Sequence, residues 1–378
     1  MTAPAVPSVR YVSAYDRSGY AVAARRYLRS LAVAGKPVAW APLFNTQAGY
    51  VPVPRSDDIP TELLTLPDQL DDSSPETSTL LVHCIPHSWH QVRAAWPDGR
   101  CIGQTVWESD PIPRRWHLEL AAADELWVPT HWNADVFRAS GIDIPVHVVP
   151  HPIESTVPGR SPLAPDPSRF DFLTVCTWDW RKRPDLTLHA FLRAFTAADP
   201  VRLIIKTDPQ VLSWRCSSPI ELNTWWQVLQ IVRQYPNAAE VVLETQPCDD
   251  AEMAALIQSA NCYVSTTCAE GWGLGAFDAA VAGIPVVITG HGGHVEWLGS
   301  DHPGLIPFRL VDADHPDTTM FEPGMKWALA DIDATVDLMR SMMQNSSSIT
   351  AAAPTLAARL GHEYSEQMVG DLMRGLVS

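Results

Sequence analysis

The chain has 378 residues, a hydrophobic fraction of 46% and a formal net charge of −16 at pH 7. This length favours two domains, each large enough to bury its own core. The negative charge argues against nucleic acid and anionic membranes as partners, because both require a basic surface on the protein.

The sequence shows no targeting or membrane segment. No apolar run approaches the roughly 20 residues of a membrane-spanning helix. The first residues, MTAPAVPSVRYVSAY, lack the basic and apolar regions of a signal peptide. The seven cysteines form no C-x-x-C pair, as is typical of reduced thiols inside a cell. We therefore expect a soluble cytoplasmic protein without integral membrane contact, with monomer and homodimer both open.

The first half of the chain alternates between strand and helix patterns. Residues 9–15 predict a strand, residues 20–35 a helix closed by Gly35, and residues 37–43 a second strand. This is a βαβ unit, so a parallel sheet begins here. The alternation continues with strands at 78–84, 101–107, 124–130 and 145–151 and helices at 113–123 and 130–141.

The second half repeats the same alternation after a change in composition. Six prolines fall between Pro150 and Pro167, a density that fits neither a helix nor a central strand. The pattern then restarts, with strands at 169–178, 201–208, 240–246, 260–267 and 284–290, helices at 183–198 and 249–260, and mostly helix from about Asp331.

These patterns predict two Rossmann-like α/β domains joined by a proline-rich linker. We expect an N-terminal domain over 1–152, the linker over 153–168 and a C-terminal domain over 169–355. Residues 356–378 predict a helix that packs back on the N-terminal domain.

The strongest functional pattern is a glycine-bearing loop that follows a predicted strand. Its residues are Glu270, Gly271, Trp272, Gly273 and Leu274. Amides at the start of a helix bind anions, and glycines let a phosphate approach the backbone. Asp278 lies in the second turn of the helix that begins near Leu274. Both carboxylates can therefore accept hydrogen bonds from the hydroxyls of one ligand.

The run EGWGLGAFDAAVAGIPV resembles the signature of the retaining GT-B glycosyltransferases of family 4, a glutamate followed after seven residues by a second glutamate. The resemblance implies a GT-B fold, with two parallel sheets facing a central cleft. It implies that Glu270 contacts the donor sugar, that the amides of residues 271–274 contact sugar and phosphate, and that Asp278 holds the ribose. Asp278 departs from the family pattern because it is one methylene shorter than glutamate.

A second match covers FLTVCTWDWRKRPDLTLHAFLRAF, where the family grips the diphosphate with an arginine and a lysine. Lys182 occupies the lysine position, and Thr177 stands where many members have the arginine. Arg181, Arg183 and Lys206 are the candidates for the missing contact. The alternative for this segment is a solvated basic turn.

Two weaker matches concern single glycines. Gly19 lies where the family places a glycine loop against the donor phosphates, although an ordinary turn explains it equally well. Gly293, in the loop before Glu296, matches a G-G-x-x-E turn near the donor.

Three histidines, His83, His87 and His90, lie at and just beyond the end of a predicted strand, where open α/β sheets bind ligands. The resemblance makes His83 the candidate near the reacting anomeric carbon and His87 a candidate acceptor contact. Ordinary loop histidines are the main alternative, and a zinc site is a weaker one because paired cysteines are missing. Glu108, after another strand, is a candidate for the acceptor side.

Tryptophan rings are a further candidate feature, because their faces suit sugars. Most of the fifteen are expected to serve packing. Four lie in or beside loops at the proposed cleft: Trp107, Trp178, Trp180 and Trp272.

The sequence thus predicts a retaining glycosyltransferase that moves a sugar from a nucleoside-diphosphate sugar, with UDP or GDP as the first candidates, to a small soluble acceptor. It needs no metal and no further cofactor. Glu270, Lys182 and His83 are the candidate catalytic residues. The alternatives are an inactive sugar-nucleotide-binding partner subunit and a GT-B sugar-nucleotide epimerase. The alanine-, arginine- and proline-rich composition suggests a bacterial source and specialised metabolism.

Overall fold

The computed structural model describes residues 8–14, 16–36, 38–46, 49–52, 77–154, 163, 166–212, 216–343 and 347–377. Contacts divide the chain into two compact units. Unit 1 contains Met1–Trp107, Pro111–Glu154 and His362–Ser378, and unit 2 contains Glu108–Asp110 and Ser155–Gly361.

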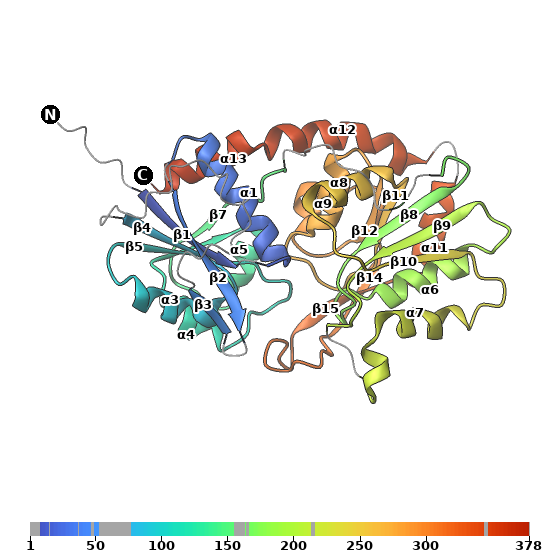
Figure 1. Cartoon of the computed structure of the whole chain (residues 1–378), viewed down its shortest axis with the longest axis horizontal. Helices are drawn as coiled ribbons and strands as arrows, with labels where there is room; N and C mark the ends of the chain where they lie inside the picture. The colour runs from blue at the N-terminus through green and yellow to red at the C-terminus, as the bar shows by residue number, and fades with distance from the viewer. Residues whose placement is uncertain are drawn as a thin grey trace. The chain divides into compact units, whose positions relative to one another are not determined.

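Unit 1 is built on a seven-stranded sheet in the order β3-β2-β1-β4-β5-β6-β7, parallel except for the edge strand β3 (Figure 1). Its inner strands are short apolar runs, as expected for strands covered by helices on both faces. The strands are β1 (Ser8–Ala14), β2 (Val38–Thr46), β3 (Gly49–Pro52), β4 (Thr77–His83), β5 (Arg100–Gln104), β6 (Glu125–Val128) and β7 (Val146–Val148).

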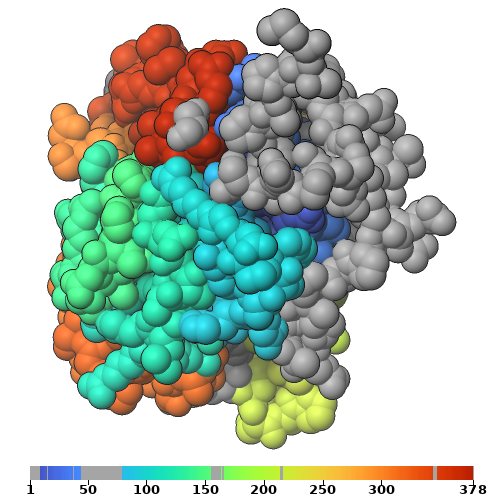
Figure 2. Space-filling view, turned by 90° about the vertical axis from the view of Figure 1, so that its left-hand side faces the viewer, coloured from blue at the N-terminus to red at the C-terminus, as the bar shows by residue number. Residues whose placement is uncertain are grey.

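The helices of unit 1 include α1 (Gly19–Val33) and α13 (Glu366–Leu376), which pack together although they lie at opposite ends of the chain (Figures 1 and 2). Arg374 donates a hydrogen bond of 2.9 Å to the carbonyl of Ala34. Apolar residues of both helices enter one core with β1. The other helical elements are η1 (Pro86–Ser88), α3 (Trp89–Ala95), α4 (Trp116–Leu120) and α5 (His131–Ala139).

Unit 2 contains a parallel six-stranded sheet in the order β10-β9-β8-β11-β12-β13 and a separate antiparallel pair, β14 and β15. The strands are β8 (Phe170–Val175), β9 (Val201–Lys206), β10 (Glu240–Glu244), β11 (Cys262–Ser265), β12 (Val286–Thr289), β13 (Leu305–Ile306), β14 (Phe308–Asp312) and β15 (Lys326–Ala330). The helical elements are α6 (Pro184–Ala194), η2 (Pro219–Leu222), α7 (Thr224–Val232), α8 (Asp250–Ser259), α9 (Leu274–Val281), α10 (His294–Leu298), α11 (Ile332–Met342) and α12 (Ser348–Glu363).

The predicted fold class, two α/β units with parallel sheets, is confirmed. The sequence patterns missed α7 and the β14–β15 pair. They also extended one strand to Trp107, whereas β5 ends at Gln104. None of the described helices is long and apolar enough to cross a membrane.

The domain boundaries differ in detail from those expected. The interior of the predicted linker, residues 155–162 and 164–165, lies outside the described residues. The predicted single helix over 356–378 is two helices, because α12 ends at Glu363 and the side chain of Ser365 caps α13. The contacts change from one unit to the other between Gly361 and His362.

The close packing of α13 on α1 depends on Gly370. A Cβ atom at this position would lie 2.1 Å from the carbonyl oxygen of Ser30. We expect Gly370→Ala to lower the free energy of unfolding by about 1–3 kcal/mol, the usual cost of overpacking. Gly375→Ala, in the same helix with no atom within 4 Å of the new Cβ, is the matched control. Urea unfolding of both variants checks this, and equal midpoints would contradict the packing.

Candidate active site

The loop after β11 carries Glu270 and leads into α9, as the sequence predicted. Gly273 has a φ of 81°, a left-handed conformation that favours glycine, and the helix begins at the next residue. Glu270 lies in this loop but does not face solvent, since only 8% of the residue is exposed. Its carboxylate therefore needs partners within the protein.

A second glycine loop fixes the backbone of Glu270. The Gly293 N–H donates to the Glu270 carbonyl at 2.8 Å. Gly292 has a φ of 114°, and a Cβ there would lie 2.5 Å from the same carbonyl oxygen. Glycine at 292 therefore lets the loop before α10 pack directly against the loop before α9.

Two consecutive cations after β8 neutralise the Glu270 carboxylate. Lys182 Nζ lies 2.5 Å from Glu270 Oε1, and Arg181 Nη1 lies 3.8 Å from Oε2. Arg181 also donates to the Ala269 carbonyl at 2.6 Å. The structure thus brings together Glu270, Lys182 and Arg181, which the sequence nominated separately.

The neighbouring charges shift the pKa of Glu270 and the pKa of Arg181. Burial acts to raise the pKa of Glu270, but Lys182 and Arg181 outweigh it and lower that pKa below its usual value. Burial likewise acts to lower the pKa of Arg181, while Glu108, Glu270 and Asp179 raise it. Glu270 and Arg181 are therefore both ionised at neutral pH.

Asp179 shapes the turn that carries both cations. Its carboxylate accepts the Arg181 N–H at 2.8 Å, and its carbonyl accepts the Lys182 N–H at 3.1 Å. His315, from the segment between β14 and β15, places Nε2 3.8 Å from the Asp179 carboxylate. The rings of Phe321 and Trp327 contact His315. The sequence analysis missed Asp179 and His315, because no recognisable motif surrounds either.

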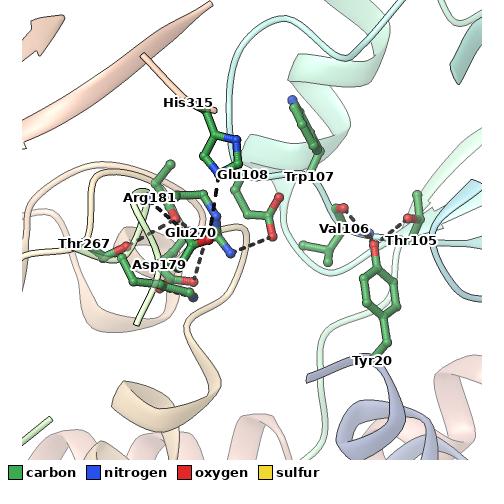
Figure 3. A network of polar contacts seen from close by, with 12 residues as sticks. Tyr20, Thr105, Val106, Trp107, Glu108, Asp179, Arg181, Thr267, Glu270 and His315 are labelled. Carbon is green, nitrogen blue, oxygen red and sulfur yellow. Dashed lines mark hydrogen bonds and ion pairs between the residues drawn. The ribbon is translucent and has the colours of Figure 1, made fainter. Parts of the chain in front are cut away.

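Glu108 lies beside Arg181, with Oε1 3.4 Å from Nη2 (Figure 3). The segment Glu108–Asp110 belongs to unit 2, although the residues before and after it in the chain belong to unit 1. The Ser109 hydroxyl donates to the Lys326 carbonyl at 3.0 Å, which fixes this segment on β15. The sequence suggested an acceptor contact for Glu108, and no feature of the sequence indicated the ion pair with Arg181.

The candidates for the cation missing at Thr177 differ in their surroundings. Arg183 forms a bidentate pair with Asp185 at 2.9 and 2.8 Å, and its guanidinium stacks on Trp180. Lys206 donates to the Gln246 carbonyl at 2.6 Å. Of the three, Arg181 is the candidate whose guanidinium contacts the Glu270 network.

The start of α9 offers the remaining donor-side groups. Residues Gly271 to Gly273 lead into Leu274, the first helical residue, and Asp278 follows in the second turn. Gly275 packs close to a neighbouring ring, since a Cβ there would lie 2.8 Å from the Tyr263 hydroxyl.

Three of the four candidate tryptophans have buried rings that present no face to a ligand. Trp107, Trp178 and Trp272 are at most 3% exposed. The Trp272 ring packs on Phe277 and Trp297, so this side chain is part of the core and its backbone alone can contact a ligand. Trp180 is half-buried.

Two of the unit 1 candidates, His83 and His87, have side chains that are buried or half-buried. His83 is 2% exposed, and its Nδ1 lies 2.7 Å from the Tyr11 hydroxyl. Burial lowers the pKa of His83 to about 3, so it is neutral at physiological pH. These features favour the alternative of a structural histidine. His87 is half-buried at the edge of the Trp116 ring, and Gly19 is the first residue of α1, capped by Ser18.

Within the described part of the chain, no group of three or more His, Cys, Asp or Glu side chains is arranged to hold a metal ion.

The fold of the two units is that of the GT-B glycosyltransferases, as solved structures show. Sucrose-phosphate synthase from Thermosynechococcus elongatus matches with a TM-score of 0.68 and 14% identity, covering 98% of both chains. The α,α-trehalose-phosphate synthase (UDP-forming) from Burkholderia xenovorans, solved with glucose-6-phosphate, matches with a TM-score of 0.64 and 13% identity over 98% of this chain and 99% of that one. A point mutant of S. aureus TarM, solved with fondaparinux, α-GlcNAc-glycerol and UDP, matches with a TM-score of 0.56 and 11% identity. The match covers 79% of this chain and 55% of the TarM chain, so this chain spans about half the length of TarM.

Within this class, residues 227–371 match the profile of the family described as "Family 4 Glycosyltransferase in conflict systems". No curated protein gives a significant match. The fold and the family match together confirm the predicted resemblance to the GT-B glycosyltransferases of family 4.

The Glu270 network generates a prediction about stability and pH. Because the folded-state pKa of Glu270 lies below the unfolded value of about 4.3, its ionised form stabilises the fold above that pH, and the contribution is lost as the pH falls through the folded pKa. We expect Glu270→Gln to cost about 1–3 kcal/mol at pH 7 and progressively less below about pH 4. Urea unfolding between pH 3.5 and 7 measures this. Asp337→Asn, at an exposed position of α11, is the control. If the free energy of unfolding lost in Glu270→Gln does not change with pH, the Glu270 network is contradicted.

Proposed function

We propose that this protein transfers a sugar from a nucleoside-diphosphate sugar to a small soluble acceptor, with retention of configuration at the anomeric carbon and without a metal ion. The observation that carries the proposal is the Glu270 carboxylate held between Lys182 and Arg181 beside the start of α9. Both cations and the helix start offer positive potential to a diphosphate.

Each group has a distinct role in this proposal. Lys182 and Arg181 neutralise the diphosphate and stabilise the charge that develops as it leaves. The amides of residues 271–274 bind phosphate and sugar, Glu270 accepts hydrogen bonds from sugar hydroxyls, and Asp278 binds the ribose. Metal independence rests on the resemblance to family 4, because the cluster of two cations and three carboxylates has no net positive charge of its own. Retention rests on the resemblance to family 4.

The nature of the substrates rests on broader arguments. The TarM structure contains UDP and the B. xenovorans synthase is described as UDP-forming, so UDP is the first nucleotide to test. The net charge of −16 favours a small soluble acceptor over an anionic lipid surface. The seven free cysteines agree with a bacterial cytoplasmic protein, and its composition with specialised metabolism.

The second candidate is a sugar-nucleotide-binding subunit without transferase activity. The threonine at 177 and the shortened carboxylate at 278 favour it. Such a subunit would bind a sugar nucleotide at the same site but would not transfer the sugar.

The first prediction from this proposal concerns nucleotide binding. We expect one of UDP, GDP, ADP and dTDP, each at millimolar concentration, to raise the melting temperature of the wild type. The same nucleotide should bind Lys182→Ala about tenfold or more weakly, because a charged hydrogen bond to phosphate contributes about 1–3 kcal/mol. Differential scanning fluorimetry and calorimetric titration measure both effects. Unchanged affinity in the variant would move the phosphate site elsewhere.

The second prediction concerns turnover. Glu270→Ala should lower release of nucleoside diphosphate from the donor at least 100-fold, because it removes the sugar contact and leaves Lys182 without its partner. Asp337→Asn should retain wild-type activity. Chromatography of the products separates transfer from epimerisation, which would convert the donor without any acceptor. A Glu270→Ala protein with wild-type turnover would refute the assignment.

A further inference from the structure

Glu108 is fixed beside Arg181 by the backbone on which it lies. The Ser109 hydroxyl donates to the Lys326 carbonyl at 3.0 Å, and the Lys326 N–H donates to the Asp110 carbonyl at 3.3 Å. The Glu108 side chain is 21% exposed and that of Arg181 is 15% exposed. The Glu108 carboxylate is therefore held in the group of charges around Arg181 by its own backbone.

The presence of Glu108 makes the cluster negative. Arg181 and Lys182 supply two positive charges, and Glu108, Glu270 and Asp179 supply three negative ones, which leaves a net charge of −1 when His315 is neutral. Glu270 binds Lys182, and Asp179 closes the turn that carries both cations. The ion pair of Glu108 is with Arg181, the cation that the proposed diphosphate would also use.

A donor and its product differ in charge at the phosphate farther from the nucleoside. In a nucleoside-diphosphate sugar this phosphate is joined to the sugar by an ester bond and to the other phosphate by an anhydride bond, and it carries one negative charge. During transfer the bond from the anomeric carbon to the phosphate oxygen breaks, and the oxygen keeps the electron pair. The acceptor oxygen bonds to the carbon and gives its proton to the leaving phosphate. That proton has a pKa of about 6, so it passes to water near pH 8 and the free diphosphate then carries one more negative charge than the donor did.

We infer that Glu108 makes the site discriminate against the free nucleoside diphosphate and in favour of its ester, and so promotes product release. The inference rests on the proposed function. A partly buried carboxylate is weakly screened by salt, so it repels a ligand approaching Arg181 more strongly when the ligand carries the additional charge. The intact donor, with the smaller charge, is repelled less.

The test compares two ligands that differ in this one charge and contain no sugar. These are UDP and its β-methyl ester, or the corresponding pair for the base selected by thermal shift, titrated calorimetrically at pH 8. The wild type should bind the methyl ester at least threefold more tightly than the free diphosphate. Glu108→Gln should bind the free diphosphate about tenfold more tightly than the wild type does and the ester about threefold more tightly, so that the preference disappears.

Asp110→Asn is the matched control, because it removes a carboxylate from the same segment at an exposed position and keeps the backbone carbonyl that Lys326 uses. It should change both affinities less than twofold.

Other outcomes would overturn the inference. If Glu108→Gln lowered the affinity for both ligands by the same factor, the role of Glu108 would be to hold Arg181 in place for binding. Unchanged affinities would mean that Glu108 does not act on the ligand. A wild type that prefers the free diphosphate would refute the inference without any variant, even if Glu108→Gln does not fold. Absence of binding of every nucleotide to the wild type would refute the proposed donor site, and this inference with it.

Discussion

The buried carboxylate of Glu270 is the interaction on which the loops of unit 2 depend. A carboxylate this far from water is costly unless cations and hydrogen bonds compensate for the lost solvent. Lys182 and Arg181 supply that compensation from the loop after β8, which is adjacent to β11 in the sheet. Because the two strands are parallel neighbours, their C-terminal ends bring the cations and the carboxylate to one edge. Gly292 then lets a third loop pack on the Glu270 backbone, where the Gly293 N–H donates to the Glu270 carbonyl.

The same need for compensation extends outward from the two cations. Asp179 holds the backbone of the turn, His315 lies beside Asp179, and Glu108 lies beside Arg181. His315 and Glu108 come from outside the β8 loop. His315 lies in the segment between β14 and β15, and Glu108 lies beside Ser109, which is hydrogen-bonded to β15. Dipoles and charges fixed in advance need no reorganisation when a ligand arrives, which is the condition for strong electrostatic stabilisation of a leaving group.

The sequence predicted the parts of this arrangement that depend on local pattern. Continuous apolar runs separated by helical periodicity are sufficient to indicate parallel sheets, and the spacing of Glu270 and Asp278 is a property of one loop and one helix. The contact between Glu108 and Arg181 joins segments far apart in the chain, and only the completed fold determines it. Whether a side chain is buried also depends on residues that lie far away in the sequence. The Trp272 ring follows a glycine in a loop motif, as a ligand-facing ring would, yet Phe277 and Trp297 enclose it. His83 ends a strand at the sheet edge where ligands bind, yet it is buried against Tyr11.

The charge balance of the cluster also limits how a proposed donor could be held. Two cations facing three carboxylates cannot bind a diphosphate through net attraction alone. The remaining favourable terms must come from groups that carry no formal positive charge, namely the amides before α9 and the hydroxyl contacts of Glu270 and Asp278. Those contacts form with the sugar and the ribose as well as with phosphate. Affinity would then be distributed over the whole sugar nucleotide, so that cleavage of the sugar removes favourable contacts at the same step at which it adds negative charge. Both changes weaken the hold on the product, and a site of this composition would favour turnover over tight binding of the nucleoside diphosphate.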